Sequence, residues 1–319
     1  MATDTSIEWT DKTWSPVTGC DRVSPGCTNC YALTMAKRLK AMGSAKYQTD
    51  GNPKTSGPGF GIAVHAAAFM EPLRWKKPRR VFVNSMSDLF HSGIGTADLH
   101  LIFGVMAATP QHTYQVLTKR HGRMRSLLND PQFAHMAFHR AKMYGRPDTS
   151  PRTWPLPNVH LGVSVENQKW ADIRIKALAQ TPAAVRFLSC EPLLGPVRLP
   201  LTEAVGGCNC GGYGPPYYVH EPSCGYEPGP AYSIDWVIIG GESGPGARLF
   251  DPQWAADLID DARQASAAPF VKQLGSVWAR DTYVNGKSVA AHGDTKGGNP
   301  DYWPAHLRVR EYPQEAASV

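Results

Sequence analysis

Three cysteines lie close together near the start of the chain, in the stretch TGCDRVSPGCTNCYA (18–32). Cys20, Cys27 and Cys30 have the spacing C-x6-C-x2-C. Three kinds of chemistry need thiols this near to one another: a disulfide framework, a zinc site and an iron–sulfur cluster. The chain has seven cysteines, an odd number that is small for a secreted scaffold, so disulfides are the least favoured of the three.

The choice between zinc and an iron–sulfur cluster depends on the fourth ligand. A structural zinc ion takes four protein ligands, and the nearest histidine, His65, is far along the chain. A [4Fe–4S] cluster held by three thiolates leaves one iron open for a substrate or cofactor. Cys30 is expected to begin a helix, whose positive end stabilises thiolates, and Gly19, Pro25 and Gly26 supply turns. The spacing favours the cluster, with zinc completed by a distant residue as the alternative.

A second group of cysteines lies in the stretch VGGCNCGGYGPPYYVHEPSCGYEPGPAY (205–232). Cys208, Cys210, His220 and Cys224 are ligand types that suit zinc. Their pattern, C-x-C followed by H-x3-C, is not a common zinc spacing. A small structural zinc loop is the preferred interpretation, and unligated thiols are the alternative.

Polar side chains follow the apolar segments of the chain at six places. In a parallel barrel the carboxyl ends of the strands share one face, and active sites lie on that face. Six polar ends in succession therefore indicate an enzyme. They are Asn84, Ser85, Ser87 and Asp88; Lys119 and Arg120; Ser164, Glu166 and Asn167; Cys190 and Glu191; Glu242 and Ser243; and Lys272 and Gln273.

These side chains must be positioned by an alternation of strands and helices. Short apolar or β-branched segments predict strands within 80–88, 113–120, 158–167, 185–192, 235–244 and 269–275. Helical patterns occupy 29–43, 96–109, 167–180 and 251–266, with Thr96 as an expected N-cap and Gly43 as a C-cap. Such an alternation indicates an α/β fold with a parallel sheet covered on both faces. With one more strand near the N-terminus, we predict a full or partial (β/α) TIM-like barrel rather than a doubly wound sheet.

The whole chain, 1–319, is predicted to be one barrel domain. Residues 44–79 and 205–232 are rich in glycine and proline and are read as insertions, and 276–319 is a C-terminal extension. No run of eighteen apolar residues occurs, and the N-terminus lacks a basic segment followed by an apolar one. We therefore expect neither a membrane span nor a secretory signal. The few cysteines favour a reducing compartment, the cytoplasm.

The net charge of +6 is unevenly distributed. Residues 70–152 contain thirteen Lys and Arg against five Asp and Glu, including WKKPRR (75–80) and TKRHGRMR (118–125). Such a basic region suits a phosphate-rich partner, DNA or RNA, and a solvated basic face is the alternative. Arg123 and Arg125 follow the strand predicted at 113–120, so they are expected to open onto the active face.

Seven blocks, in order along the chain, resemble a phage-associated family of uncharacterised proteins. They are IEWTDKTWSPVTGC…SPGCTNCYA, VFVNSMSDLFH, QVLTKR, LGVSVENQ, AVRFLSCEPLLGP, DWVIIGGESGPGAR and PFVKQLG, and the closing KGGNPDYWPAHLRVREYP (296–313) is also similar. That family is grouped with the radical S-adenosylmethionine (SAM) enzymes and is distantly similar to spore photoproduct lyase, a DNA-repair enzyme. The resemblance implies a barrel of the radical SAM type with a [4Fe–4S] cluster on Cys20, Cys27 and Cys30. The open iron would bind SAM, which is cleaved reductively to a 5′-deoxyadenosyl radical.

Two features depart from the usual radical SAM pattern. The usual motif is C-x3-C-x2-C with an aromatic residue before the last cysteine, whereas here the first gap is six and Tyr31 follows Cys30. A Gly-Gly-Glu motif usually ends the second strand and holds the SAM amino group. Here that strand ends in NSMSD, and Gly240-Gly241-Glu242 comes far later. The contacts to SAM must therefore be assigned by position.

Charge complementarity and strand order suggest which strand ends would contact SAM. Asp88, with Ser85 and Ser87, is the candidate for the ammonium group. The other candidates are Ser164, Glu166 and Asn167 for the ribose hydroxyls and Lys119 or Arg120 for the carboxylate.

The catalytic candidates are Cys190, Glu191 and Lys272. Cys190, at a strand end, is a candidate hydrogen-atom donor, the role that a cysteine plays in photoproduct lyase. The alternative is an inert buried thiol, which is the commoner state of a free cysteine. The structural alternative for Lys272, at the end of an apolar strand, is a pair with a buried carboxylate such as Glu191 or Glu242.

We therefore expect a SAM-dependent radical enzyme that repairs or modifies DNA or RNA. Reductive cleavage would need an electron donor such as flavodoxin or ferredoxin. The alternative is a non-catalytic nucleic-acid-binding protein in which both cysteine groups hold zinc. The polar strand ends favour the enzyme.

Overall fold

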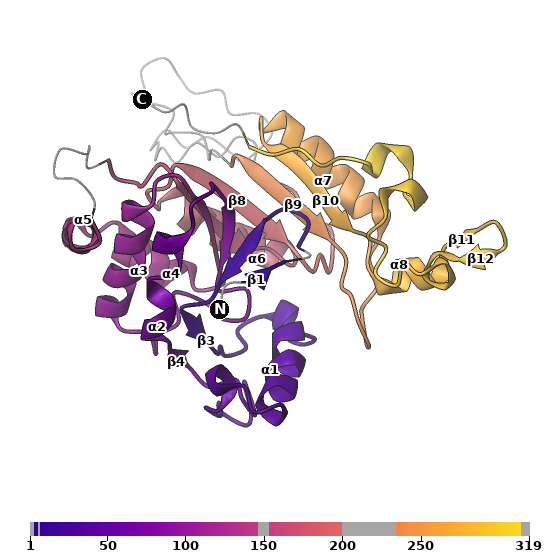
Figure 1. Cartoon of the computed structure of the whole chain (residues 1–319). Coiled ribbons are helices and arrows are strands. Elements are labelled where there is room, and N and C mark those ends of the chain that lie inside the picture. The colour runs from indigo at the N-terminus through magenta and orange to yellow at the C-terminus, as the bar shows by residue number, and fades with distance from the viewer. Residues whose placement is uncertain (1–2, 6, 146–152, 200–233, 314–319) are drawn as a thin grey trace, which may run out of the picture.

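The fold is built on one large sheet, seen in a computed structural model that describes residues 3–5, 7–145, 153–199 and 234–313 (Figure 1). The strand order is β1-β2-β5-β6-β7-β8-β9-β10. Their bounds are β1 Thr3–Asp4, β2 Lys12–Trp14, β5 Arg80–Val83, β6 Thr113–Thr118, β7 Val159–Ser164, β8 Val185–Cys190, β9 Trp236–Gly240 and β10 Ala268–Gln273. The strands from β2 to β10 are parallel, and β1 is antiparallel to β2.

The seven parallel strands form a half-barrel, which confirms the predicted α/β class and is compatible with a partial TIM-like barrel. Their spatial order follows the chain, whereas a doubly wound sheet reverses its order at a switch point. Both edges of the parallel part of the sheet are covered. β1 pairs with β2 at one edge, and at the other residues 309–311 run along β10 through an antiparallel bridge between Phe270 and Arg310. Covered edges resist pairing with other chains.

Helices follow most of the parallel strands. Their bounds are α1 Tyr31–Ala41, α2 Ala66–Phe69, α3 Thr96–Ala108, α4 His121–Leu128, α5 Pro131–Met143, α6 Gln168–Ala179, α7 Pro252–Gln264 and α8 Ser276–Asp281. α3 begins after Gly95, so Thr96 is the first helical residue rather than the predicted N-cap. Two short antiparallel strand pairs, β3 (Val17–Thr18) with β4 (Ala63–Val64) and β11 (Tyr283–Val284) with β12 (Lys287–Ser288), lie outside the sheet.

Alternation along each strand separates two faces of the half-barrel. On β7, Val159, Leu161 and Val163 join the core beneath the helices, whereas His160 and Ser164 lie on the concave face with the side chains of the second core. The helix-covered core is the larger one and contains most of the buried apolar side chains. The concave face has a smaller core of Trp9, Phe82, Phe187, Trp236, Ile238 and Phe270.

The aromatic side chains of the concave core fill the half-barrel toward the amino ends of its strands. Trp9 comes from the segment before β2, and its ring lies 4.6 Å from that of Phe82 and 5.9 Å from that of Trp236, centroid to centroid. Phe187 lies over Gly162 of the neighbouring strand, where a Cβ atom would approach its ring to 2.4 Å. The aromatic core therefore occupies the amino end of the concave face, and the polar strand ends lie at its carboxyl end.

The concave face also buries a histidine, which gives a pH prediction. Burial lowers the pKa of His160 from its usual 6.5 to about 4. His160 binds a proton below about pH 6.5 in the unfolded chain but only below about pH 4 in the folded one. The free energy of unfolding should therefore fall as the pH drops from 6.5 to 4. The loss is about 3 kcal/mol at 1.36 kcal/mol per pH unit.

His160→Gln should flatten this slope in urea unfolding measured from pH 7 to pH 4. The matched control is His139→Gln on the exposed side of α5, which should leave the slope as it is. An unchanged slope in the His160 variant would contradict the assignment.

Among the residues described, no helix is both long and apolar enough to cross a bilayer.

Candidate functional site

The three cysteines lie in a loop, residues 18–30, that joins β3 to α1 and is called the cysteine loop below. Cys27 ends a 3-10 helix, Pro25–Cys27, and Cys30 is the N-cap of α1, as its sequence position predicted. The thiols are free rather than joined in a disulfide. Burial, together with the charge of Asp88, raises the pKa of the Cys20 thiol to about 12. The neighbouring Arg120 opposes this rise.

The end of β5 holds the first part of the loop. The Asn84 side chain accepts a hydrogen bond from the Val17 amide at 3.4 Å, and the Ser87 hydroxyl donates to the Val17 carbonyl at 2.9 Å. The Tyr31 hydroxyl donates to the Ser85 carbonyl at 2.5 Å, which ties the start of α1 to the same strand end. Gly19 forms a bridge with Ser87 at φ 87°, a conformation that favours glycine. The serines predicted to contact SAM therefore support the cysteine loop.

Asp88 joins the ends of β5 and β6 and positions Arg120. One carboxylate oxygen accepts from the Phe90 amide and the Thr118 hydroxyl, and the other from the Lys119 amide and the Arg120 guanidinium. Arg120 in turn donates to Cys20 Sγ at 3.4 Å and to the Asp21 carbonyl at 3.3 Å. Asp88 is thus bound by four donors. Its predicted contact with the SAM ammonium would require one of them to be displaced.

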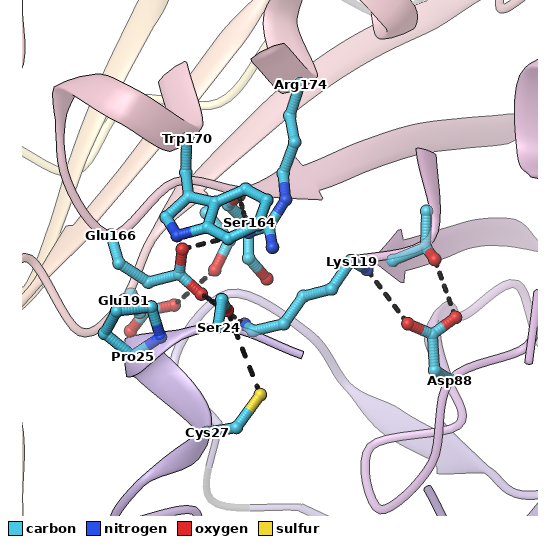
Figure 2. Close-up of polar contacts among 12 residues, drawn as sticks. Ser24, Pro25, Cys27, Asp88, Lys119, Ser164, Glu166, Trp170, Arg174 and Glu191 are labelled. Carbon is cyan, nitrogen blue, oxygen red and sulfur yellow. Dashed lines mark hydrogen bonds and ion pairs between the residues drawn. The ribbon is translucent and has the colours of Figure 1, made fainter. Parts of the chain in front are cut away.

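Glu166 forms a buried ion cluster at the end of β7 (Figure 2). Its carboxylate lies 3.2 Å from Lys119 Nζ and 2.9 Å from an Arg174 nitrogen, and it accepts from the Ser24 hydroxyl of the cysteine loop at 2.5 Å. Ser24 Oγ also lies 3.9 Å from Cys27 Sγ. Burial alone would raise the pKa of Glu166, but the two cations lower it below its usual range. The cluster therefore connects the half-barrel to a cysteine through one hydroxyl.

The surroundings of this cluster leave little freedom for its members. Trp170 stacks on the Arg174 guanidinium, 4.0 Å from the ring centroid, and Asn167 caps α6 by accepting from the Trp170 amide. Gly26 of the cysteine loop lies against Glu166, where a Cβ atom would approach Oε1 to 2.7 Å. The predicted ribose-binding side chains Glu166 and Asn167 thus already have partners within the protein. Their contact with SAM stays a prediction.

A second ion pair, after β9, holds the far end of the loop. Glu242 binds Arg248 at 2.6 Å and accepts from the Asn29 side chain at 3.1 Å. Arg248 also donates to the Pro25 carbonyl at 3.0 Å. Glu242, the last residue of Gly240-Gly241-Glu242, therefore helps to hold the cysteine loop in place. Burial would raise the pKa of Glu242, but the hydrogen bonds from Arg248 lower it.

The insertion at 44–79 supports the loop from the side opposite the sheet. Asp21 accepts from the hydroxyls of Thr55 at 2.5 Å and Ser56 at 2.8 Å, and it pairs with His91 at 3.0 Å. Cys20 and Cys30 pack against the small apolar cluster that includes Tyr47 and Phe60. Residues of the insertion therefore form one wall of the site.

Glu191 and Lys272 pair across the carboxyl ends of β8 and β10, which is the structural alternative considered for Lys272. Their charged groups lie 3.0 Å apart, and both side chains are partly exposed. Burial alone would lower the pKa of Lys272, but the charge of Glu191 raises it above its usual value. Gly240 lies beside the pair, since a Cβ there would approach Glu191 Oε1 to 2.9 Å. Unlike Glu166 and Glu242, this pair has no hydrogen bond or ion pair to the cysteine loop within the described residues.

Cys190 lies on the opposite face of the sheet from Ser189 and Glu191. It is fully buried in the core beneath the helices, among residues such as Leu188 and Leu193, and burial raises the pKa of its thiol. Period-two alternation explains the difference, because neighbouring residues of a strand point to opposite faces. This placement argues against the predicted role of Cys190 as a hydrogen-atom donor on the concave face.

The cations that follow β6 are bound within the protein. Lys119 and Arg120 belong to the two networks above, Arg123 donates to the carbonyls of His91 and Ile94, and Arg125 donates to Gln180. The sequence predicted that Arg123 and Arg125 would open onto the active face. Their hydrogen bonds instead serve neighbouring loops.

Two further points concern metal ligands. Cys208, Cys210, His220 and Cys224 lie outside the residues that the structure describes. Within the described ranges, no three His, Cys, Asp or Glu side chains are placed to surround one metal ion.

Sequence reasoning missed the residues that connect the loop to the half-barrel. They are Ser24, Asn29, His91, Arg174 and Arg248. Each of them lies in a loop or helix rather than at a strand end. Ser24, Asn29 and His91 bind partners that are distant in the sequence, whereas Arg174 and Arg248 bind nearby ones. Those two follow Glu166 and Glu242 by eight and six residues, which was a usable signal.

Fold and site together define an α/β half-barrel protein whose strand ends hold a loop with three free cysteines. The chain belongs to DUF5131, a family of proteins of unknown function, whose model matches residues 4–303. No curated protein and no solved structure matches the chain.

Proposed function

We propose that this protein is a SAM-dependent radical enzyme that holds a [4Fe–4S] cluster on Cys20, Cys27 and Cys30. One observation carries the proposal: ion pairs, hydrogen bonds and a backbone bridge from the ends of β5, β6, β7 and β9 all converge on the cysteine loop. Active sites of parallel barrels lie at these strand ends. A loop that only linked β3 to α1 would not need two buried or half-buried ion pairs to hold it.

The residues present fit such a cluster. Each thiolate of an iron–sulfur cluster binds a different iron, so the three sulfur atoms need not surround one point as the ligands of a zinc ion do. Arg120 donates to Cys20 Sγ, and the charge of Lys119 acts on Cys30, which suits an anionic group bound by thiolates. When bound, the cluster would supply one-electron reduction of SAM.

The chain's own residues would bind and orient SAM and the substrate. Glu191 and Lys272 offer both charges to a zwitterion such as the methionine part of SAM, and Ser164 and Ser189 line the same concave face. The aromatic core that includes Trp9 excludes water from the amino end of the half-barrel. We assign the zwitterion to the Glu191–Lys272 pair in preference to Asp88, because Asp88 is already bound by four donors.

The proposed substrate is DNA or RNA, in keeping with the basic composition and with the resemblance to a repair enzyme. The second candidate is a zinc-stabilised nucleic-acid-binding protein without catalysis. It is retained because Cys208, Cys210, His220 and Cys224 suit zinc.

The enzyme is tested by anaerobic purification and reconstitution with iron and sulfide. We expect a brown protein that converts SAM to 5′-deoxyadenosine when dithionite is added, with a Lys272→Met variant binding SAM at least about tenfold more weakly because it lacks a charge-assisted contact. Calorimetry measures the affinity and chromatography the product. A colourless protein that contains zinc and leaves SAM intact would establish the alternative instead.

The nucleic-acid substrate is tested by the salt dependence of binding. A protein that neutralises several phosphates releases counterions, so the affinity for a labelled DNA or RNA oligonucleotide should fall steeply between 50 and 200 mM salt, by about a hundredfold or more. Fluorescence anisotropy measures it. Salt-independent binding, or none, would move the substrate to another class.

A further inference from the structure

The side chain of Tyr31 lies over the carboxyl end of the concave face, which is called the mouth of the half-barrel below. Its hydroxyl donates to the Ser85 carbonyl, just after β5, at 2.5 Å. Burial of this hydroxyl raises the pKa of Tyr31, and the charges of Cys30 and Glu191 raise it further, which places Glu191, just after β8, nearby as well. Two strands, β6 and β7, separate β5 from β8 in the sheet. A side chain that is near both strand ends therefore lies across the mouth.

The ring of Tyr31 is accessible although its hydroxyl is bound. The residue is 57% exposed, and because the hydroxyl end is enclosed, the exposed part is the ring. Tyr31 is the first residue of α1, a helix that buries Ala32 and Ala36 against the cluster containing Phe60. The helix and the hydrogen bond thus hold the ring at both ends. A ring held in this way loses little conformational entropy when a ligand contacts it.

The charges around the mouth are joined in pairs. A cleft attracts phosphate groups when positive charge dominates its lining. Here four cations of the strand-end loops each bind a carboxylate, so little net positive charge is left for a phosphate. A ligand at the mouth should therefore gain affinity from the ring rather than from these cations. The pairs are Lys119–Glu166, Arg120–Asp88, Arg248–Glu242 and Lys272–Glu191.

A rigid, exposed aromatic ring in such a place suits a flat, unsaturated ligand. A single exposed aromatic residue is ordinary on a protein surface, but this one is fixed at the mouth, beside Cys30. Nucleobases of every kind stack on aromatic side chains, and each stacked base adds to the affinity. A base inside a duplex has no free face, because its neighbours cover it. Only an unpaired base, or one turned out of the helix, can therefore reach Tyr31.

We propose that Tyr31 binds one unpaired base of the nucleic acid by stacking, so that the substrate is single-stranded or has its target base turned out of the duplex. This rests on the proposed function, since it takes nucleic acid as the substrate. The stacked base would lie beside the Glu191–Lys272 pair and next to the cysteine loop. The adenine of SAM offers the same kind of ring, so the test must separate the two sources.

The test compares strands with and without bases, bound to the full-length protein. The probes are a short labelled single strand of DNA, the same strand made entirely of abasic sites, and the duplex. Tyr31→Leu should weaken binding of the single strand by about tenfold or more, measured by fluorescence anisotropy. Binding of the abasic strand and of the duplex should be the same in both proteins. Tyr31→Phe loses the hydrogen bond to Ser85 but keeps the ring, so it should retain most of the affinity.

Tyr283→Leu is the matched control, because it removes an exposed tyrosine ring in β11, well separated from α1 in Figure 1. It should leave single-strand binding as it is, and thermal unfolding should show that all three variants are folded. The affinity of Tyr31→Leu for SAM, measured by calorimetry, should equal that of the unmodified protein.

Two results would overturn the stacking role of Tyr31 and leave the proposed function standing. One is equal binding of the single strand by Tyr31→Leu and the unmodified protein. The other is weaker SAM binding in Tyr31→Leu with single-strand binding retained, which would assign the ring to the adenine of SAM. An unmodified protein that binds none of the strands would instead contradict nucleic acid as the substrate, and the stacking role with it.

Discussion

Replacing Cys27 with alanine is expected to remove iron from the reconstituted protein almost completely. A cluster held by three thiolates cannot spare one of them, and Cys27 lies between the other two ligands on its own 3-10 helix. Cys20→Ala and Cys30→Ala should behave in the same way. Iron and acid-labile sulfide are measured per chain, together with the visible absorption spectrum.

The matched control for these variants is Cys190→Ala, because Cys190 is buried in the helix-covered core. It should keep the iron at a modest loss of stability. Cys208→Ala, Cys210→Ala and Cys224→Ala should also keep it. Full iron content in Cys27→Ala would be incompatible with the proposed cluster, and iron lost from Cys208→Ala as well would mean that the two cysteine groups share one site.

Glu166→Gln is expected to destabilise the protein by about 3–5 kcal/mol, because it leaves the fully buried Arg174 without its carboxylate. The same change replaces a charge-assisted hydrogen bond from Ser24 with a neutral one, so the cysteine loop should become more susceptible to proteolysis. Urea unfolding measures the first effect and limited digestion with mass spectrometry the second. The cluster should also be lost faster on exposure to a chelator.

Two comparisons make this prediction specific. The double variant Glu166→Gln with Arg174→Met has no unpaired buried guanidinium. Its free energy of unfolding should therefore recover in part, while the cysteine loop stays as susceptible to proteolysis as in the single variant. Glu311→Gln breaks the ion pair with Arg263, both members of which are about half exposed, and should cost less than about 1 kcal/mol. Equal losses in the single and double variants would show that burial of the charge is not the cause.

The sequence predicted the elements of the half-barrel well because its strands are apolar and its helices carry local signals. Each predicted strand segment contains an observed strand, and Asp251 caps α7. α4 and α5 were not predicted, although Asp130 before Pro131 is a common helix start. The basic residues of this stretch suggested a phosphate-binding region. The spacing of the apolar residues Phe133, Ala137 and Phe138, which are buried in α5, is the signal that would have predicted a helix.

The sequence allowed the location of the site to be predicted, but not which of its residues bind one another. Parallel strands bring their carboxyl ends together whatever their sequence, so the location of Asp88, Glu166 and Glu242 followed from topology. Which groups they bind depends on the path of the cysteine loop, and no local pattern encodes that path. Ser24 reaches Glu166 and Asn29 reaches Glu242 across separations of 142 and 213 residues.

These separations also set the order in which the site can be made. The ribosome supplies the chain from its N-terminus, so the cysteines emerge early, while Arg248 and Glu242 emerge after three quarters of the chain has been synthesised. Until then the loop lacks the partners that fix Pro25 and Asn29. If the three thiols hold the proposed cluster, its assembly on a correctly shaped loop must follow the synthesis of β9. A chain truncated before residue 248 would carry the same three thiols without the structure that holds them.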